Sequence, residues 1–210
     1  MPQLYPKTKR VSDVIVSSLL IIVLSPLMIL FSCLLFTEHV LRGRIFSPLF
    51  YKKDRISQGK IFTLYKFNIF KQEILDDMRN NNEFIHTKDL ENNGGLIFIG
   101  KILKQIYLDE SPQLFSILYG KISLVGPRPL NTEVFEKISE NEKVARINLK
   151  AGITGNFQSF KNCKGKTAKE LDLEYYNYFL KNINSPIKIF LFDLKIILRT
   201  IKVILRAKGV

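Results

Sequence analysis

Residues 14–36 read VIVSSLLIIVLSPLMILFSCLLF, a run of 23 residues without a charge. As a straight helix rising 1.5 Å per residue it would measure roughly 34 Å, against about 30 Å for the hydrocarbon core of a bilayer. The run is too long for the apolar part of a cleaved signal peptide, and it lacks a small-x-small cleavage site. We therefore predict that it enters a membrane.

Ser25 and Pro26 lie at the midpoint of this run. Proline removes a backbone donor and costs about 3 kcal/mol inside an ordinary helix. Both flanks are basic, and the positive-inside rule then assigns both ends to the cytoplasm; the residues are Lys7, Lys9 and Arg10 before the run and Arg42, Arg44, Lys52, Lys53 and Arg55 after it. We expect a re-entrant helix broken at Ser25-Pro26, with halves of about 16 Å each. A transmembrane helix merely kinked by the proline is the alternative.

The remaining chain predicts a mainly helical α+β fold. We expect residues 1–40 to form the anchor and residues 41–210 to form a domain at the cytoplasmic face, integrated with the anchor into one unit. Aromatic-rich runs at 45–51 and 60–67 predict a small β-hairpin. The helices are expected at 69–78, 96–108, 111–119, 131–148, 167–181 and 187–205, and residues 79–95 are expected to form a polar loop.

The segment 187–205 and the residue after it predict a basic amphipathic helix. Lys195, Arg199, Lys202 and Arg206 follow one another at steps of four, three and four, which places them on one helical face. Beside an apolar anchor, such a helix is typical of contact with an anionic membrane surface. The alternative is a helix packed on the protein's own core with a solvated basic face.

The charge balance indicates an anionic partner. The chain has 210 residues, with 32 Lys and Arg against 19 Asp and Glu, a net charge of +13. Two cysteines, Cys33 and Cys163, exclude a disulfide framework and a zinc cluster, and we expect His39 and His86 at the surface or the membrane interface rather than on a metal. The net charge alone suggests the hypothesis of nucleic-acid binding. The sequence has no recognisable nucleic-acid-binding module, so we expect no nucleic-acid partner.

Asp109 and Glu110 form the most suggestive local pair, in the stretch LDESPQL at 108–114. One interpretation is a helix cap, in which the carboxylates are held ionised by the helix dipole. The other is chemical: an ionised carboxylate can attack phosphorus when a divalent cation offsets the charge of the substrate.

Two further segments contain prolines or glycines that restrict the backbone or let it pack closely. In SLVGPRP at 123–129, prolines on either side of Arg128 hold a planar bidentate donor suited to phosphate, although a structural turn with a surface arginine explains the segment equally well. In AGITG at 151–155, the glycines allow close backbone approach or positive φ.

Taken together, these segments resemble the bacterial sugar transferases, the monotopic phosphoglycosyl transferases. The resemblance covers about residues 9–209 and rests on motifs in family order: Ser25-Pro26, Tyr65-Lys66-Phe67, Leu108-Asp109-Glu110-x-Pro112-Gln113, Ser123 to Pro129, Gly152 to Gly155 with Gln158, Asp172-x-x-Tyr175, and Asp193-Leu194-Lys195. At this length the chain looks like the minimal catalytic form.

The resemblance implies transfer of a sugar-1-phosphate from a UDP-sugar to polyprenol (undecaprenyl) phosphate with release of UMP, at the cytoplasmic face of the bacterial inner membrane. It implies Asp109 as nucleophile of a ping-pong reaction and Glu110 as a Mg²⁺ ligand beside it or a helper of the lipid phosphate. Lys66 and Arg128 would hold phosphates, with Pro129 and Asp172 in the substrate site. Downstream glycosyltransferases of a glycan pathway would be partners.

The chain departs from the family pattern at several positions. Asn68 follows Phe67 where the family has arginine, Lys104 and Ile106 replace an Arg-x-Thr, Gly95 replaces a basic residue, and Ala151 replaces proline. These departures bear on the sugar site and the rate, and they motivate an alternative function, a catalytically inactive membrane scaffold of glycan assembly. The sequence does not identify the sugar.

Overall fold

The computed structural model describes residues 4–80, 90–91, 94–160 and 165–206. The described elements, in order, are α1 (Lys7–Leu41), β1 (Phe50–Ser57), β2 (Lys60–Phe67), α2 (Gln72–Asn80), α4 (Phe98–Gln105), the 3-10 helix η1 (Leu108–Glu110), α5 (Gln113–Leu118), β3 (Ser123–Val125), α6 (Thr132–Lys137), α7 (Glu140–Asn148), β4 (Gly152–Thr154), α8 (Ala168–Lys181) and α9 (Pro186–Arg206). The mainly helical α+β prediction is confirmed. Most of the expected polar loop, with His86, and the loop cysteine Cys163 lie outside the described residues.

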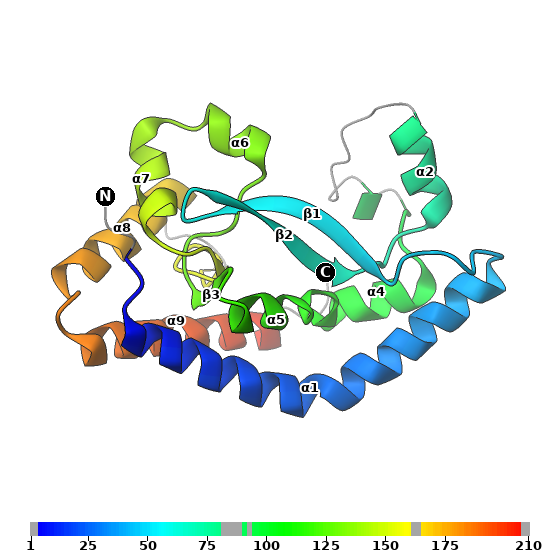
Figure 1. The fold of residues 1–210 in the computed structure, drawn as a ribbon, viewed down its shortest axis with the longest axis horizontal. Coiled ribbons are helices and arrows are strands. Elements are labelled where there is room, and N and C mark those ends of the chain that lie inside the picture. The colour runs from blue at the N-terminus through cyan, green and yellow to red at the C-terminus, as the bar shows by residue number, and fades with distance from the viewer. Residues whose placement is uncertain (1–3, 81–89, 92–93, 161–164, 207–210) are drawn as a thin grey trace.

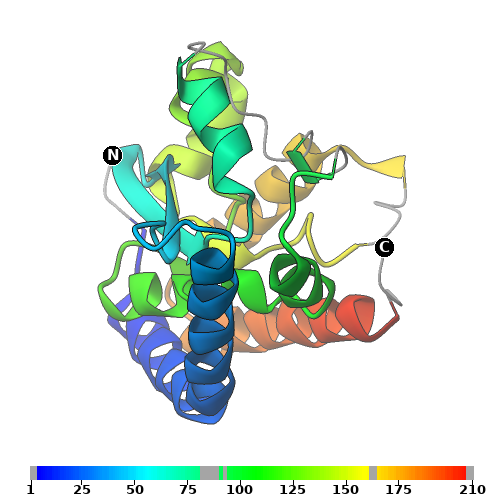
Figure 2. The same cartoon turned by 90° about the vertical axis from the view of Figure 1, so that its right-hand side faces the viewer.

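Helix α1 is continuous through Pro26 and bends near its middle (Figure 1). A proline at 26 leaves the carbonyl of Ile22 without its usual N–H partner, and the Ser25 hydroxyl donates to that carbonyl at 2.9 Å. The expected break is therefore a bend within one helix, because the serine supplies the missing donor. In Figures 1 and 2 both ends of α1 turn toward the rest of the protein, and its middle lies farthest from the hairpin.

The face of α1 that points away from the protein is apolar and exposed. Within the described chain, α1 is the one helix long and apolar enough to cross a membrane by length and composition. Its exposed large side chains include Val11, Ile15, Leu19, Ile22, Val23, Ile29, Leu30 and Phe36.

The β-hairpin exists, but its first strand starts later than expected. Strand β1 occupies residues 50–57 rather than 45–51, and pairs with β2 from Phe50↔Phe67 to Ser57↔Lys60. Gln58 and Gly59 both have positive φ, the requirement of a two-residue type I′ turn. The charged run KKDR, expected between the two aromatic-rich runs, lies in β1, where alternate side chains line a pocket or face solvent.

Two helix boundaries also differ from the prediction. The expected helix 131–148 is two helices, α6 and α7, because Ser139 and Glu142 form a capping box that starts a new one. Helix α4 starts at Phe98 and stops before Tyr107, whose φ of 57° is left-handed. Helices α8 and α9 match the expected ranges closely.

A short parallel pair, β3 and β4, was not predicted. Of the two roles expected for the glycines of 151–155, Gly152 has the close backbone approach and not the positive φ. A Cβ on Gly126 would lie 2.2 Å from the carbonyl oxygen of Lys150, and one on Gly152 would lie 2.1 Å from the nitrogen of Gly126. Only glycine permits this contact. The pair thereby fixes the start of the turn that carries Arg128.

The core consists of two clusters of buried side chains. One joins β2, α5, β3, α8 and α9 around Ile117, Ile122 and Phe179, and the other joins the C-terminal half of α1 to β2, α2 and α4 around Leu35, Phe67 and Leu103. In Figures 1 and 2 the hairpin lies on one side of α4 and α5, and α1 and α9 lie on the other. His39, expected at the surface or the membrane interface, is buried in α1.

Candidate active site

The residues of the expected nucleophile pair lie in a sharp turn between two helices. Tyr107, in the left-handed region, ends α4, and the single 3-10 turn Leu108–Glu110 follows before α5 begins. A non-glycine residue held at positive φ carries strain that the surrounding packing must compensate. Leu108 supplies part of that packing, since its side chain is buried in the cluster with Leu103.

The carboxylate of Asp109 is buried and has no hydrogen bond to any described residue. Burial, followed by the negative charge of Glu110, raises the pKa of Asp109 from 3.8 to about 6, although Lys66 and Lys104 oppose the shift. The helix-cap interpretation is not supported, because no side chain caps α5. A carboxylate that is desolvated and without donors is available to a reacting atom or a cation.

Glu110 has a different environment. Its Oε1 atom lies 2.5 Å from Nζ of Lys66 on β2. Burial alone would raise its pKa, but Lys66, Arg128 and a hydrogen bond from Gln113 lower the pKa overall. The two adjacent carboxylates thus differ in pKa, the arrangement expected where they have separate roles.

A small pocket opens beside Asp109, between the hairpin and η1. Three cations line it, Lys53 and Arg55 from β1 and Lys66 from β2, with Tyr51 as an aromatic wall. Burial, and then repulsion by neighbouring cations, lowers the pKa of Lys53, and burial lowers that of Arg55. Clustered, desolvated cations are suited to a diphosphate.

The sequence analysis missed Lys53 and Arg55 as pocket residues. The four consecutive charged residues 52–55 show no alternation of polar and apolar side chains, so the sequence carried no signal that Lys53 and Arg55 face a pocket. They were counted only as basic flanks of the anchor.

Arg128 is exposed at the tip of the turn after β3, and Pro129 beside it is half-buried. The charge of Arg128 contributes to lowering the pKa of both Glu110 and Arg55, so it acts on the same site from another element. The structure therefore brings Asp109, Glu110, Lys66 and Arg128 together.

Asp172 lies elsewhere. Its carboxylate is 2.7 Å from Nη2 of Arg146, in a buried ion pair that joins α7 to α8. It does not line the pocket beside Asp109. The contact gives Asp172 a structural partner, and its place in a substrate site stays a prediction.

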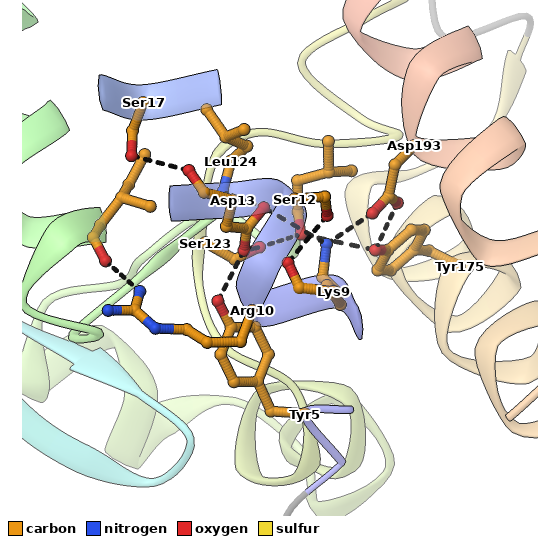
Figure 3. Close-up of polar contacts among 12 residues, drawn as sticks. Tyr5, Lys9, Arg10, Ser12, Asp13, Ser17, Ser123, Leu124, Tyr175 and Asp193 are labelled. Atoms are coloured by element: carbon orange, nitrogen blue, oxygen red, sulfur yellow. Dashed lines mark hydrogen bonds and ion pairs between the residues drawn. The ribbon is translucent and has the colours of Figure 1, made fainter. Parts of the chain in front are cut away.

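A buried polar network joins α1 to β3, α8 and α9, and sequence reasoning missed it (Figure 3). Asp13 accepts hydrogen bonds from the hydroxyls of Tyr5 at 2.7 Å and Ser123 at 2.6 Å. Lys9 lies 2.5 Å from Asp193 of α9, which also accepts a bond from Tyr175 at 2.8 Å. The signal was the placement of Lys9 and Asp13 one turn apart just before the apolar run.

The family departures have local explanations in the structure. The Asn68 amide donates to the carbonyl of Pro48 at 2.9 Å, and the N–H of Ala151 donates to the Ser57 hydroxyl at 3.1 Å, a bond that proline cannot make. Lys104 forms an ion pair with Glu91, which also lines the pocket. A Cβ on Gly95 would lie 2.6 Å from the carbonyl oxygen of Leu90, and Ile106 is the exposed C-cap of α4.

Asp109 and Glu110 fit a magnesium ion that substrate phosphates also ligate. The described residues contain no group of three or more metal-ligating side chains, but magnesium is commonly held by one or two carboxylates together with substrate phosphates. The open oxygens of Asp109, next to Glu110 and a cationic pocket, agree with that donor set.

Comparison with known proteins gives consistent matches over almost the whole chain. An undecaprenyl-phosphate galactose phosphotransferase of Salmonella typhimurium is 31% identical over 212 residues, covering 96% of this chain and 41% of that protein. An uncharacterized sugar transferase EpsL of Bacillus subtilis is 34% identical over 84% of this chain and 80% of its own length. A UDP-glucose:undecaprenyl-phosphate glucose-1-phosphate transferase of Klebsiella pneumoniae is 30% identical over 92% of this chain and 39% of that protein.

This chain thus spans less than half the length of the Salmonella and Klebsiella relatives. The model of the bacterial sugar transferase family matches residues 4–207, which contain Asp109 and Glu110, the cationic pocket and the network of Figure 3. The chain belongs to the bacterial sugar transferase family.

Proposed function

We propose that this protein transfers a sugar-1-phosphate from a UDP-sugar to undecaprenyl or another polyprenol phosphate and releases UMP. The observation that carries the proposal is the Asp109 carboxylate, buried without a hydrogen bond to a described residue, beside a pocket lined by Lys53, Arg55 and Lys66. Relatives whose names specify undecaprenyl phosphate and a sugar phosphate support this substrate class. The reaction starts a membrane-bound glycan that downstream glycosyltransferases extend.

In the first step, an oxygen of Asp109 attacks the β-phosphorus of the UDP-sugar. A bond forms between that oxygen and phosphorus, while the bond from the β-phosphorus to the bridging oxygen breaks. UMP leaves with the electron pair, and the sugar phosphate stays on the enzyme as an acyl phosphate. Lys66 and Arg128 hold phosphate oxygens and offset the charge that develops on the leaving group.

In the second step, a phosphate oxygen of the lipid acceptor attacks the phosphorus of this intermediate. The bond to Asp109 breaks, and the carboxylate is regenerated as the polyprenol diphosphate sugar forms. Glu110, paired with Lys66, orients the incoming phosphate. Two steps through one carboxylate avoid the direct meeting of two anionic substrates.

Asp109 and Glu110 would hold Mg²⁺, which when bound supplies positive charge to the diphosphate. The remaining positive charge comes from the cations of the pocket and from Arg128.

We place the protein at the cytoplasmic face of the membrane, with α1 entering and leaving by that face. The bend of α1 with both ends toward the protein supports this topology (Figures 1 and 2), as do its basic flanks. Helix α9 adds an exposed apolar stripe, which would lie at the interface beside anionic lipids; its residues are Ile187, Phe190, Leu191, Leu194, Leu198, Ile201 and Leu205. Arg199 lies on the same helical face as Lys195 and Lys202, and its guanidinium donates to Asn156 at 2.9 Å and stacks on Phe160.

The test is a screen of UDP-sugars with polyprenol phosphate and Mg²⁺, using the purified chain in nanodiscs. We expect UMP release with at least one sugar and its loss in Asp109→Asn, whereas Asp54→Asn, at an exposed position on β1, should retain activity. Release of UDP instead of UMP would show ordinary glycosyl transfer. Absence of turnover across the panel, in folded protein, would favour the scaffold alternative.

A further inference from the structure

The N-terminus of α4 is capped by a residue of another helix. The N-cap residue, Ile97, offers no side-chain acceptor, and the first turn of α4 contains no acidic residue. Instead the carboxylate of Glu38, near the C-terminal end of α1, accepts from the N–H of Phe98 and the N–H of Ile99, each at 2.8 Å. Arg42, 3.0 Å from the same carboxylate, holds it in place.

The C-terminus of α5 is held by the opposite end of α1. The guanidinium of Arg10 donates to the carbonyl oxygens of Ile117 and Leu118, the last two residues of α5. The carbonyl of Ile117 also accepts from the N–H of Gly120 at 2.8 Å, so Arg10 adds a second donor there. Figure 3 shows Arg10 directed toward this segment.

The two contacts are complementary in charge and in position. A negative group lies at the positive end of α4, and a positive group lies at the negative end of α5, as the helix dipoles favour. The segment between them, residues 98–118, contains η1 and therefore Asp109 and Glu110. The anchor helix holds the catalytic segment at both of its outer ends, and the bend at Pro26 lies between the two contacts.

We infer that Glu38 and Arg10 are positioning residues, through which the bent membrane helix fixes the catalytic turn in its reactive geometry. Neither side chain lines the cationic pocket. They act through α4 and α5, and α4 measures about 12 Å along its axis at 1.5 Å per residue. A further constraint fits this role: a Cβ on Gly100 would lie 2.5 Å from the carbonyl oxygen of Ile69, so α4 packs against the chain after β2 with no space to shift.

This inference rests on the proposed function for its kinetic part only. If Glu38 and Arg10 position the turn, removing them leaves the phosphate-binding cations in place and displaces the nucleophile. A displacement on the order of 1 Å can reduce a rate about 100-fold. We therefore expect kcat for UMP release to fall about tenfold or more, while KM for the UDP-sugar changes less than about threefold.

The experiment compares Glu38→Ala and Arg10→Met with two matched controls, all in nanodiscs. Glu170→Ala removes a carboxylate that caps α8 at the N–H of Thr167, 2.7 Å away, and Arg44→Ala removes a cation that pairs with exposed acidic groups on α2. Hydrogen–deuterium exchange of residues 98–118 is measured on the same samples. We expect faster exchange in this segment in both test variants and in neither control, and partial recovery of kcat in Glu38→Gln, which keeps an acceptor oxygen.

Unchanged exchange at 98–118 in Glu38→Ala, or unchanged kcat in an active enzyme, would overturn the inference. An equal effect of Glu170→Ala would overturn it as well, since any lost helix cap would then suffice. If the wild-type chain released no UMP, the proposed function would fail, and the exchange measurement would still decide whether α1 holds the catalytic segment.

Discussion

Replacing Asp13 by asparagine tests how strongly the polar network joins α1 to the catalytic domain. The carboxylate of Asp13 accepts from two buried hydroxyls at 2.6–2.7 Å and lies 4.0 Å from Nζ of Lys9 (Figure 3). Asparagine keeps the shape but loses the charge, and its NH₂ group must face either a hydroxyl or the N–H of Leu124.

The size of the effect follows from these contacts. Hydrogen bonds to a charged group contribute about 1.5–3 kcal/mol, and bonds to a neutral group about 0.5–1.5 kcal/mol. Replacing the charged acceptor by a neutral one therefore reduces the contribution of the two hydroxyl bonds by about 2 kcal/mol together. Removing one partner of a buried ion pair costs up to about 5 kcal/mol, but Lys9 keeps Asp193 at 2.5 Å, which limits this part. We expect Asp13→Asn to lower the free energy of unfolding by about 3 kcal/mol, which corresponds to about 6–12 °C in Tm for a chain of this size.

The assay is thermal unfolding followed by far-UV circular dichroism in detergent. Asp54→Asn is the matched control, because its carboxylate accepts one exposed hydrogen bond, from Thr63 at 2.9 Å, and its loss should lower the stability by less than about 1 kcal/mol. A Tm of Asp13→Asn equal to that of the control would refute the reasoning and show that the network contributes no net stability.

Three further predictions concern the site and its supports. In Gly126→Ala the new Cβ meets a backbone carbonyl oxygen at 2.2 Å, so we expect a loss of about 3 kcal/mol or more in the same unfolding assay. In Lys66→Met, Glu110 loses its 2.5 Å partner and the diphosphate loses a cation, so kcat/KM for the UDP-sugar should fall at least about 100-fold, consistent with the strength of charge-assisted bonds. Burial raises the pKa of Asp172 to about 6 despite Arg146, so the folded protein binds this proton more tightly than the unfolded chain. Relative to Asp172→Asn, the wild type should therefore lose up to about 3 kcal/mol of stability as the pH rises from 4 to 6, with no further change above pH 6. A stability difference between wild type and Asp172→Asn that stays constant or increases from pH 4 to 6 would contradict the raised pKa of Asp172.

The features that the sequence predicted best depend on local patterns. Proline at 26 with a serine before it predicted a helix perturbation in the apolar run, and the serine hydroxyl makes the bond that turns a break into a bend. Helices α8 and α9 have a cap or a proline at the start and a periodic apolar face, so their ranges agreed closely.

The features that it missed depend on tertiary contacts. The charged run of β1 is a strand because its alternate side chains meet the pocket beside Asp109, a neighbour far away in the chain. The cap of α4 comes from Glu38, some 60 positions earlier, and no pattern within α4 itself predicts it. Lys66, Arg128, Asp109 and Glu110 were placed together through family resemblance, whereas Lys53 and Arg55 required the register of the hairpin.

The most direct test of the account is the mass of the peptide that contains Asp109, after the chain is mixed with a UDP-sugar that supports turnover and with no lipid acceptor. The account predicts one equivalent of UMP and a gain of one sugar phosphate on Asp109, discharged when polyprenol phosphate is added. Labelling of a different residue, or nucleotide release only when both substrates are present, would contradict it.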